Sequence, residues 1–143
     1  MATRRIDLTR ITEEPQRLPV RDVVRELVDL LGRKTVAYLA GLNSVREVTS
    51  WLTPDGTAPR DSREAVLRSA LQAARMIADL ESRDSAAAWF VGTNATFDFE
   101  SPASILRERG TEGRAPVLRA ARSFVVGAFA AELAREKIAG HEQ

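Results

Sequence analysis

The chain has 143 residues, which suits one domain or two small helical lobes that share a core. Hydrophobic residues make up 44% and charged residues 29%, as in ordinary globular proteins, and a net charge of +1 does not by itself indicate nucleic-acid binding. The lack of cysteine excludes disulfides and thiolate metal sites, and no apolar run is long enough to span a membrane. Because the basic start continues into polar sequence and not into an apolar signal segment, we expect a cytoplasmic protein.

Residues 1–19 contain Pro15, Pro19 and mixed charges without a sustained helical period. Proline removes a backbone donor and restricts the residue before it, so this stretch predicts a flexible arm. Such a segment either stays disordered or becomes ordered on a partner, and the first is the simpler expectation.

Three helical segments are expected after the arm. Apolar residues recur at helical spacing over residues 20–31, and Gly32 ends that helix because glycine reaches left-handed backbone at little cost. Two shorter helices follow at residues 35–40 and 44–52, separated by a break that begins at Gly41. Two short helices joined by a tight turn with a glycine are typical of a helix-turn-helix unit.

In such a unit the second helix enters the major groove of DNA, where its outward side chains meet base edges. The side chains expected to contact bases or phosphates are Arg33, Lys34, Ser44, Arg46, Thr49 and Ser50. The pattern is degenerate, because the aliphatic Val48 lies seven positions after Gly41 where six is usual, and Glu47 on the reading face would repel phosphates. A DNA-binding unit and a helical pair kept only for packing both remain open.

A long helix is expected over residues 61–80. Asp61 and Glu64 lie in its first turn, where the helix dipole favours acidic side chains. Its broad apolar face consists of Leu67, Ala70, Leu71, Ala74, Ile77, Ala78 and Leu80. We therefore expect this helix to be the central strut that joins both halves of the chain.

The last part of the chain predicts a turn and a further helix start. Asn94 tolerates left-handed backbone and hydrogen-bonds its own turn, which explains this residue without any partner. Ser101 followed by Pro102 begins a helix, because the hydroxyl accepts a free amide and the proline ring suits the first helical position. Gly127 lies within a later helix, where glycine is less favourable than alanine by about 1 kcal/mol. This cost in helix stability indicates either a close contact with another helix or a break in the helix.

The order of these features resembles the C-terminal toxin-binding domain of the MbcA/ParS/Xre antitoxins. In that family a tryptophan, a turn asparagine, a helix-opening proline, a loop glycine and a following valine recur in this order. Here the matching residues are Trp89, Asn94, Pro102, Gly110 and Val117.

The resemblance implies an all-α fold in which a degenerate helix-turn-helix lobe is joined by a long helix to a helical toxin-binding lobe. The expected division is 1–19 for the arm, 20–60 for the helix-turn-helix-like lobe, 61–82 for the connecting helix and 83–143 for the toxin-binding domain. It implies an antitoxin that neutralises a cognate toxin, often a RES-domain protein that consumes NAD, in a complex that represses its own operon.

Toxin binding is expected at residues that the resemblance singles out and at apolar residues of the last helix. These are Trp89, Asn94, Pro102, Phe124, Gly127, Phe129 and Leu133. The chain departs from the family because it continues well past Gly127, with Phe129, Leu133 and Ile138 at roughly helical spacing. Such an extension either lies in a groove of the toxin or packs on a second antitoxin, and we expect the toxin groove.

No residue set predicts catalysis or a cofactor. His141 reads as a tail residue, and metal-ligand spacing, a phosphate-binding loop and a nucleophile motif are missing from the sequence. We therefore expect a protein that is not an enzyme. A second hypothesis is a stand-alone helix-turn-helix regulator or adaptor whose C-terminal lobe only dimerises. A homodimer is expected under either hypothesis, because the apolar faces of residues 61–80 and 117–129 are broad.

Overall fold

The regular structure of the chain is helical. The computed structural model describes residues 6–141, and within them it contains helices and no β-strand. In chain order the elements are η1 (Thr9–Glu13), α1 (Glu14–Arg17), α2 (Val20–Leu31), α3 (Arg33–Leu39), α4 (Arg46–Leu52), α5 (Asp61–Leu80), α6 (Arg83–Val91), η2 (Ala95–Phe97), α7 (Pro102–Arg109), η3 (Gly110–Gly113) and α8 (Arg114–His141). The all-α class predicted from the sequence is confirmed.

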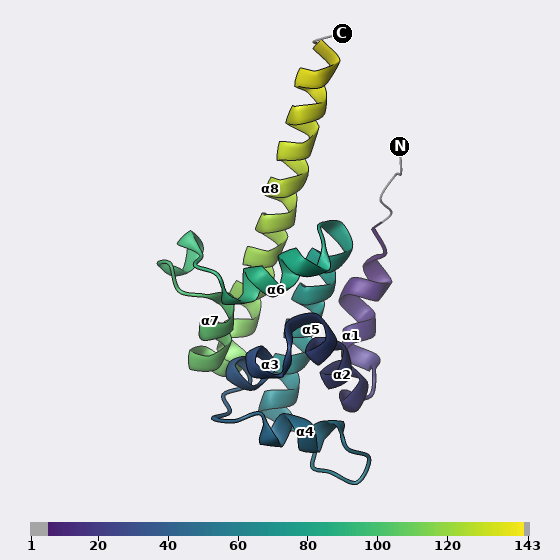
Figure 1. Ribbon diagram of the computed structural model, residues 1–143, viewed down its shortest axis with the longest axis vertical. Helices are drawn as coiled ribbons and strands as arrows, with labels where there is room; N and C mark the ends of the chain where they lie inside the picture. Colours follow the sequence, from purple (N-terminus) through teal and green to yellow (C-terminus); the bar gives the residue numbers. More distant parts are fainter. Residues whose placement is uncertain (1–5, 142–143) are drawn as a thin grey trace.

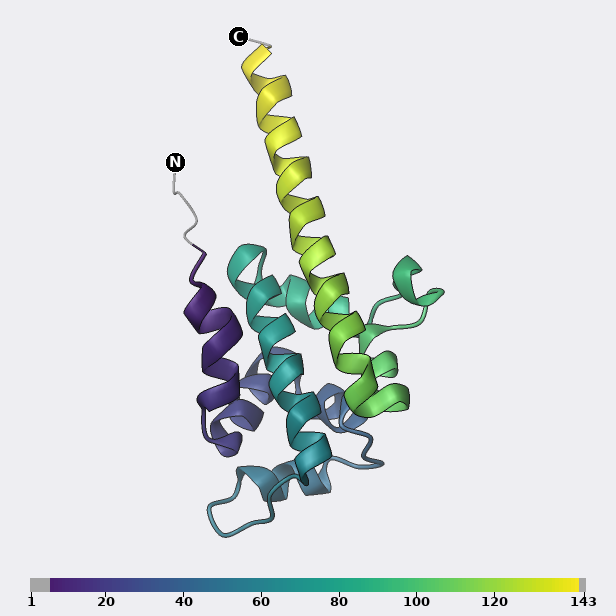
Figure 2. The same ribbon diagram turned by 180° about the vertical axis from the view of Figure 1, so that it is seen from behind.

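Helix α5 lies at the centre of the molecule and has the bounds predicted from its apolar period (Figures 1 and 2). It packs against α1, α2, α6 and α8, so helices from both halves of the chain bury their side chains on it. The buried hydrophobic residues consequently form one core. Since Leu67, Leu71 and Ile77 are fully buried within a single chain, the apolar face of α5 gives no reason to expect a homodimer.

A single glycine separates α2 from α3. Gly32 has φ +86° and ψ 156°, a region that is essentially restricted to glycine, and α3 begins at the next residue. Helix α3 therefore starts two residues before the prediction, while α4 starts two residues after it. Val48 of α4 is fully buried, as the helix-turn-helix pattern requires of its second helix.

The flexible arm predicted for residues 1–19 is wrong for the part that the structure describes. Residues 9–17 are helical, and Ile11 and Pro15 are buried. Arg68 of α5 donates hydrogen bonds to the backbone carbonyls of Pro15 (3.0 Å) and Leu18 (2.8 Å). Tertiary contacts thus order a segment whose local pattern gives no helix signal, whereas residues 1–5 lie outside the described part.

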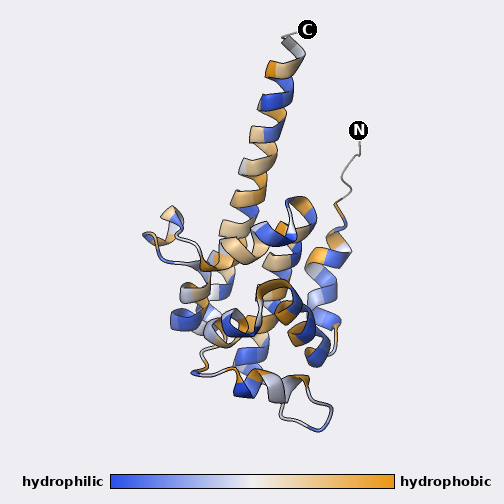
Figure 3. Cartoon of the chain, viewed as in Figure 1, coloured by the Kyte–Doolittle hydropathy of each residue, from blue (hydrophilic) through white to orange (hydrophobic). Residues whose placement is uncertain are grey.

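Helix α8 belongs to the core only over its first half. Val117, Ala121 and Val125 are buried against the body, but no side chain over residues 126–140 is buried. This second half projects away from the other helices (Figures 1 and 2), and it carries hydrophobic and hydrophilic residues in alternation (Figure 3). Neither α8 nor any other described helix combines the length and apolar character needed to cross a bilayer.

Candidate protein-binding surface

Two residues of the predicted toxin-binding set, Trp89 and Pro102, are buried in the core. Trp89 is buried, with its ring edge-on to Phe90 at a centroid distance of 5.1 Å. Pro102 is buried at the first position of α7, where Ser101 Oγ accepts a hydrogen bond from the Ser104 amide (3.0 Å). Neither side chain can contact a partner unless the fold rearranges. Both therefore contribute to packing of the core and not to direct binding.

Asn94 organises the loop between α6 and α7. Its Oδ1 accepts a hydrogen bond from the Thr96 amide (2.9 Å), and its carbonyl accepts from the amides of Phe97 and Phe99 (both 2.9 Å). Its own amide donates to the Glu100 carbonyl (3.2 Å). The side chain is used within the turn, which agrees with turn chemistry as its role.

This loop presents an exposed phenylalanine on constrained backbone. Asp98 (φ 53°) and Phe99 (φ 67°) are consecutive non-glycine residues with left-handed backbone, a conformation that costs roughly 1–3 kcal/mol per residue. Phe97 points into the core, while Phe99 is 68% exposed. The loop stands out from the body beside α7 (Figure 1). Phe99 was not among the predicted site residues, although the alternation of Phe97 and Phe99 was a usable signal.

The exposed members of the predicted set lie on α8. Phe124 lies over Trp89 (6.4 Å between centroids) and is 37% exposed. Phe129 and Leu133 are more than half exposed on the projecting half. A Cβ atom at Gly127 would meet nothing within 4 Å, and α8 continues unbroken through it, so the expectation of a close contact or a break there is wrong within this chain.

A small apolar hollow lies where α8 leaves the body. It has a volume of about 220 Å³ and is lined by Ile6, Leu80, Val125, Val126 and Phe129. The residues come from the N-terminal segment, the end of α5 and α8. This surface is apolar, whereas the rest of the projecting helix is mixed.

The residues predicted to bind DNA are only partly free. Arg33 donates a hydrogen bond to Thr49 Oγ1 (2.7 Å), so the two side chains are brought together on one face of α3 and α4. Ser50 Oγ accepts from the amide (3.0 Å) and hydroxyl (2.9 Å) of Thr57, and it therefore holds the following loop. Lys34, Ser44 and Arg46 are exposed.

Two arginines from later helices hold the turn between α3 and α4. Arg107 of α7 donates hydrogen bonds to the carbonyls of Tyr38 and Leu42 (both 2.9 Å), and its guanidinium lies 4.8 Å from the centre of the Tyr38 ring. Arg63 of α5 donates to the Ala40 carbonyl (3.0 Å). The helix-turn-helix-like unit is thus fastened to the C-terminal half.

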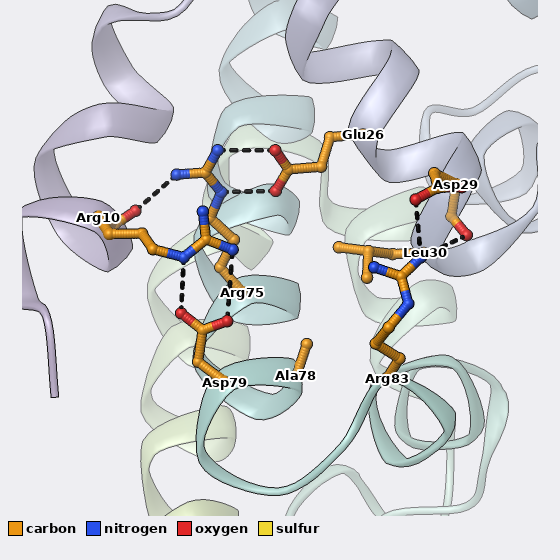
Figure 4. A pocket seen from close by; sticks show the side chains of 8 residues that line it. All are labelled: Arg10, Glu26, Asp29, Leu30, Arg75, Ala78, Asp79 and Arg83. Carbon is orange, nitrogen blue, oxygen red and sulfur yellow. Dashed lines mark hydrogen bonds and ion pairs between the residues drawn. The ribbon is translucent and has the colours of Figure 1, made fainter. Parts of the chain in front are cut away.

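A charged pocket of about 440 Å³ is lined by a structural ion-pair network (Figure 4). Arg75 is 3% exposed and donates to both carboxylate oxygens of Glu26 and to the Arg10 carbonyl, while Arg10 pairs with Asp79. The hydrogen bonds to Glu26 raise the pKa of Arg75, although burial lowers it. Among the residues described, none of these groups forms a cluster of three or more His, Cys, Asp or Glu that could hold a metal.

Comparison with known proteins gives no relative: no family model matches the chain, and neither the curated proteins nor the solved structures contain a match.

Proposed function

We propose that the protein is an antitoxin similar to the MbcA/ParS/Xre family, which binds and neutralises a RES-domain toxin in the cytoplasm. The order of Trp89, Asn94, Pro102, Gly110 and Val117 in the sequence motivates this proposal. The observation that carries the binding function is Phe99, a large aromatic side chain exposed on a loop whose backbone conformation is already fixed.

An exposed phenylalanine on a constrained loop is suited to anchor a partner protein. Aromatic residues dominate interface energies when a partner desolvates them, and a preformed loop loses little entropy on binding. The hydrogen bonds of Asn94 hold the left-handed backbone at Phe99 in the free protein. Trp89 supports Phe124, a second partly exposed aromatic side chain of the same half of the chain. We assign the toxin-binding surface to Phe99 and Phe124.

Co-expression tests this assignment. The wild-type chain should restore growth to cells that express its cognate RES-domain toxin. Phe99→Ala should weaken toxin binding by roughly 2 kcal/mol or more, as for an interface hot spot, and should reduce rescue. Leu8→Ala is the matched control, because Leu8 is similarly exposed, at 66%, but lies in the N-terminal segment. Full rescue by Phe99→Ala would count against this surface.

A second function, binding of operator DNA, rests on α3 and α4. Arg33, Lys34 and Arg46 are exposed around the start of the two helices, where phosphate contacts are expected. Promoter DNA should bind weakly and in a salt-dependent manner, and Arg46→Ala should lower the affinity measured at low salt. Arg25→Ala, which removes an exposed arginine of α2, is the control.

The alternative of a stand-alone regulator predicts the same DNA result but the opposite rescue result. DNA binding would then depend on Arg46, yet the wild-type chain would not rescue growth from any neighbouring toxin. Absence of DNA binding at low salt would instead leave α3 and α4 as a packing unit.

A further inference from the structure

We infer that the projecting half of α8 pairs antiparallel with α8 of a second copy of this chain, in a twofold-symmetric dimer. The pairing does not depend on the proposed toxin. It begins from the observation that the core ends at Val125 while the helix continues to residue 141. A lone helical segment of this length is only marginally stable in water, so its apolar residues favour a partner helix.

One stripe of α8 has the spacing of a coiled-coil seam. Its members are separated alternately by three and four residues, as in positions a and d of a heptad. They are Arg119, Arg122, Val126, Phe129, Leu133 and Glu136, and all of them are exposed. Ile138 is not part of the stripe, because it lies about 180° around the helix from Phe129 at 3.6 residues per turn. The roughly helical spacing of Phe129, Leu133 and Ile138 therefore does not place all three on one face of α8.

The stripe is basic at its start, apolar in its middle and acidic at its end. Within the described residues, Arg119, Arg122 and Glu136 form no ion pair. A shallow hollow lined by Arg119, Arg122, Ser123 and Val126 is open to an acidic side chain. A parallel pair would bring like charges together, whereas an antiparallel pair brings the arginine end of each helix to the glutamate end of the other.

The antiparallel register follows from the apolar middle. Placing Phe129 opposite Leu133 of the second copy also places Val126 opposite Glu136, with Arg122 one turn away from that carboxylate. Each chain contributes the same residues to the contact, which is the condition for a closed twofold dimer. The projecting half is about 20 Å long at 1.5 Å per residue. In this register residues 136–141 of each helix lie alongside residues 121–126 of the other, where Arg122 and Val126 are exposed.

Sedimentation of the full chain tests the pairing. The wild type should dimerise at about 100 μM, since an interface this small gives weak association. Phe129→Ala with Leu133→Ala should weaken dimerisation by roughly tenfold or more, because central apolar residues dominate interfaces. Ile138→Ala is the matched control, being an exposed apolar residue of the same segment on the other face, and it should change nothing.

Charge reversal and cross-linking test the orientation. Arg122→Glu and Glu136→Arg should each weaken dimerisation, and the two changes in one chain should restore it. Because the chain has no cysteine, Val126→Cys and Glu136→Cys chains can be mixed under oxidising conditions and should form mixed disulfides in preference to disulfides between identical chains.

Three results would overturn the inference. They are a wild type that remains monomeric at the highest concentration, equal weakening by Ile138→Ala, and failure of the double charge reversal to restore pairing. If the stripe variants instead lose toxin binding while the wild type is monomeric, the stripe belongs to the toxin interface. Circular dichroism checks that each variant keeps its helices.

Discussion

At the scale of single residues, arginine side chains make most of the long-range polar contacts among the residues described. Arg75 illustrates this, since it joins α5 to Glu26 of α2 and to Glu14 and the Arg10 carbonyl of the N-terminal segment. One guanidinium satisfies several acceptors in a fixed geometry, which a lysine ammonium could not do. The charge is buried but fully paired, so it orders the N-terminal segment without offering a reactive group.

Replacement of Arg75 should therefore destabilise the fold. Arg75→Ala removes the common partner of Glu26 and Glu14, and we expect a loss of about 3 kcal/mol in the free energy of unfolding, the lower limit for breaking a buried pair. We expect the lower limit because the carboxylates of Glu14 and Glu26 are partly exposed and remain partly hydrated after the substitution. Urea denaturation measures it, and Arg25→Ala, whose ion pair with Asp22 is exposed, should cost less than about 0.5 kcal/mol.

The contribution of Arg75 should be insensitive to moderate pH. Because its folded pKa is raised, the stabilisation is present below the pKa of the unfolded chain and is lost only as pH rises through the folded value. That range is strongly alkaline. A difference between wild type and Arg75→Ala that disappears between neutral and moderately alkaline pH would contradict this account.

At the scale of helices, α8 combines a stable half with a marginal half. Gly127 lies just past the last buried residue of α8, and a Cβ atom added there would meet nothing within 4 Å. Gly127→Ala should favour the helical state of the projecting half by about 1 kcal/mol, which is the difference in helix propensity. Amide hydrogen exchange over residues 128–138 should slow down, while the melting temperature of the core stays the same.

Ala130→Gly is the reverse control for that experiment. It changes another exposed position of the same segment and should speed exchange there by a similar factor. If Gly127→Ala instead shifts the whole unfolding transition, the two halves of α8 are not independent. If it abolishes rescue from the toxin, the partner approaches the helix closely at Gly127, as the predicted toxin-binding set requires.

At the scale of the whole molecule, the sequence predicted what local patterns determine. Both boundaries of helix α5 were predicted correctly, because its apolar period and the acidic residues of its first turn lie within the segment itself. The start of α7 was predicted because Ser101 and Pro102 act on neighbouring residues. The helices of residues 9–17 were missed because their stability comes from burial of Ile11 and Pro15 on α5, which is distant in sequence.

The candidate surface was predicted only where local sequence patterns determine it. Exposed Phe124, Phe129 and Leu133 follow from helix periodicity, but the burial of Trp89 and Pro102 depends on how α6 and α7 pack. Phe99 was missed because its exposure depends on backbone that only the folded loop defines. The contact of Arg107 with the Leu42 carbonyl spans 65 positions, so no local pattern contains it.

The arginine contacts with backbone carbonyls have a practical consequence for labelling. Arg63, Arg68, Arg75 and Arg107 each donate to carbonyls of a distant segment, so a dicarbonyl reagent that modifies guanidinium groups attacks the supports of the fold. The two lysines, Lys34 and Lys137, are exposed and form no ion pair within residues 6–140. Amine-reactive dyes therefore modify one side chain on α3 and one near the tip of α8, and they leave the arginine contacts intact.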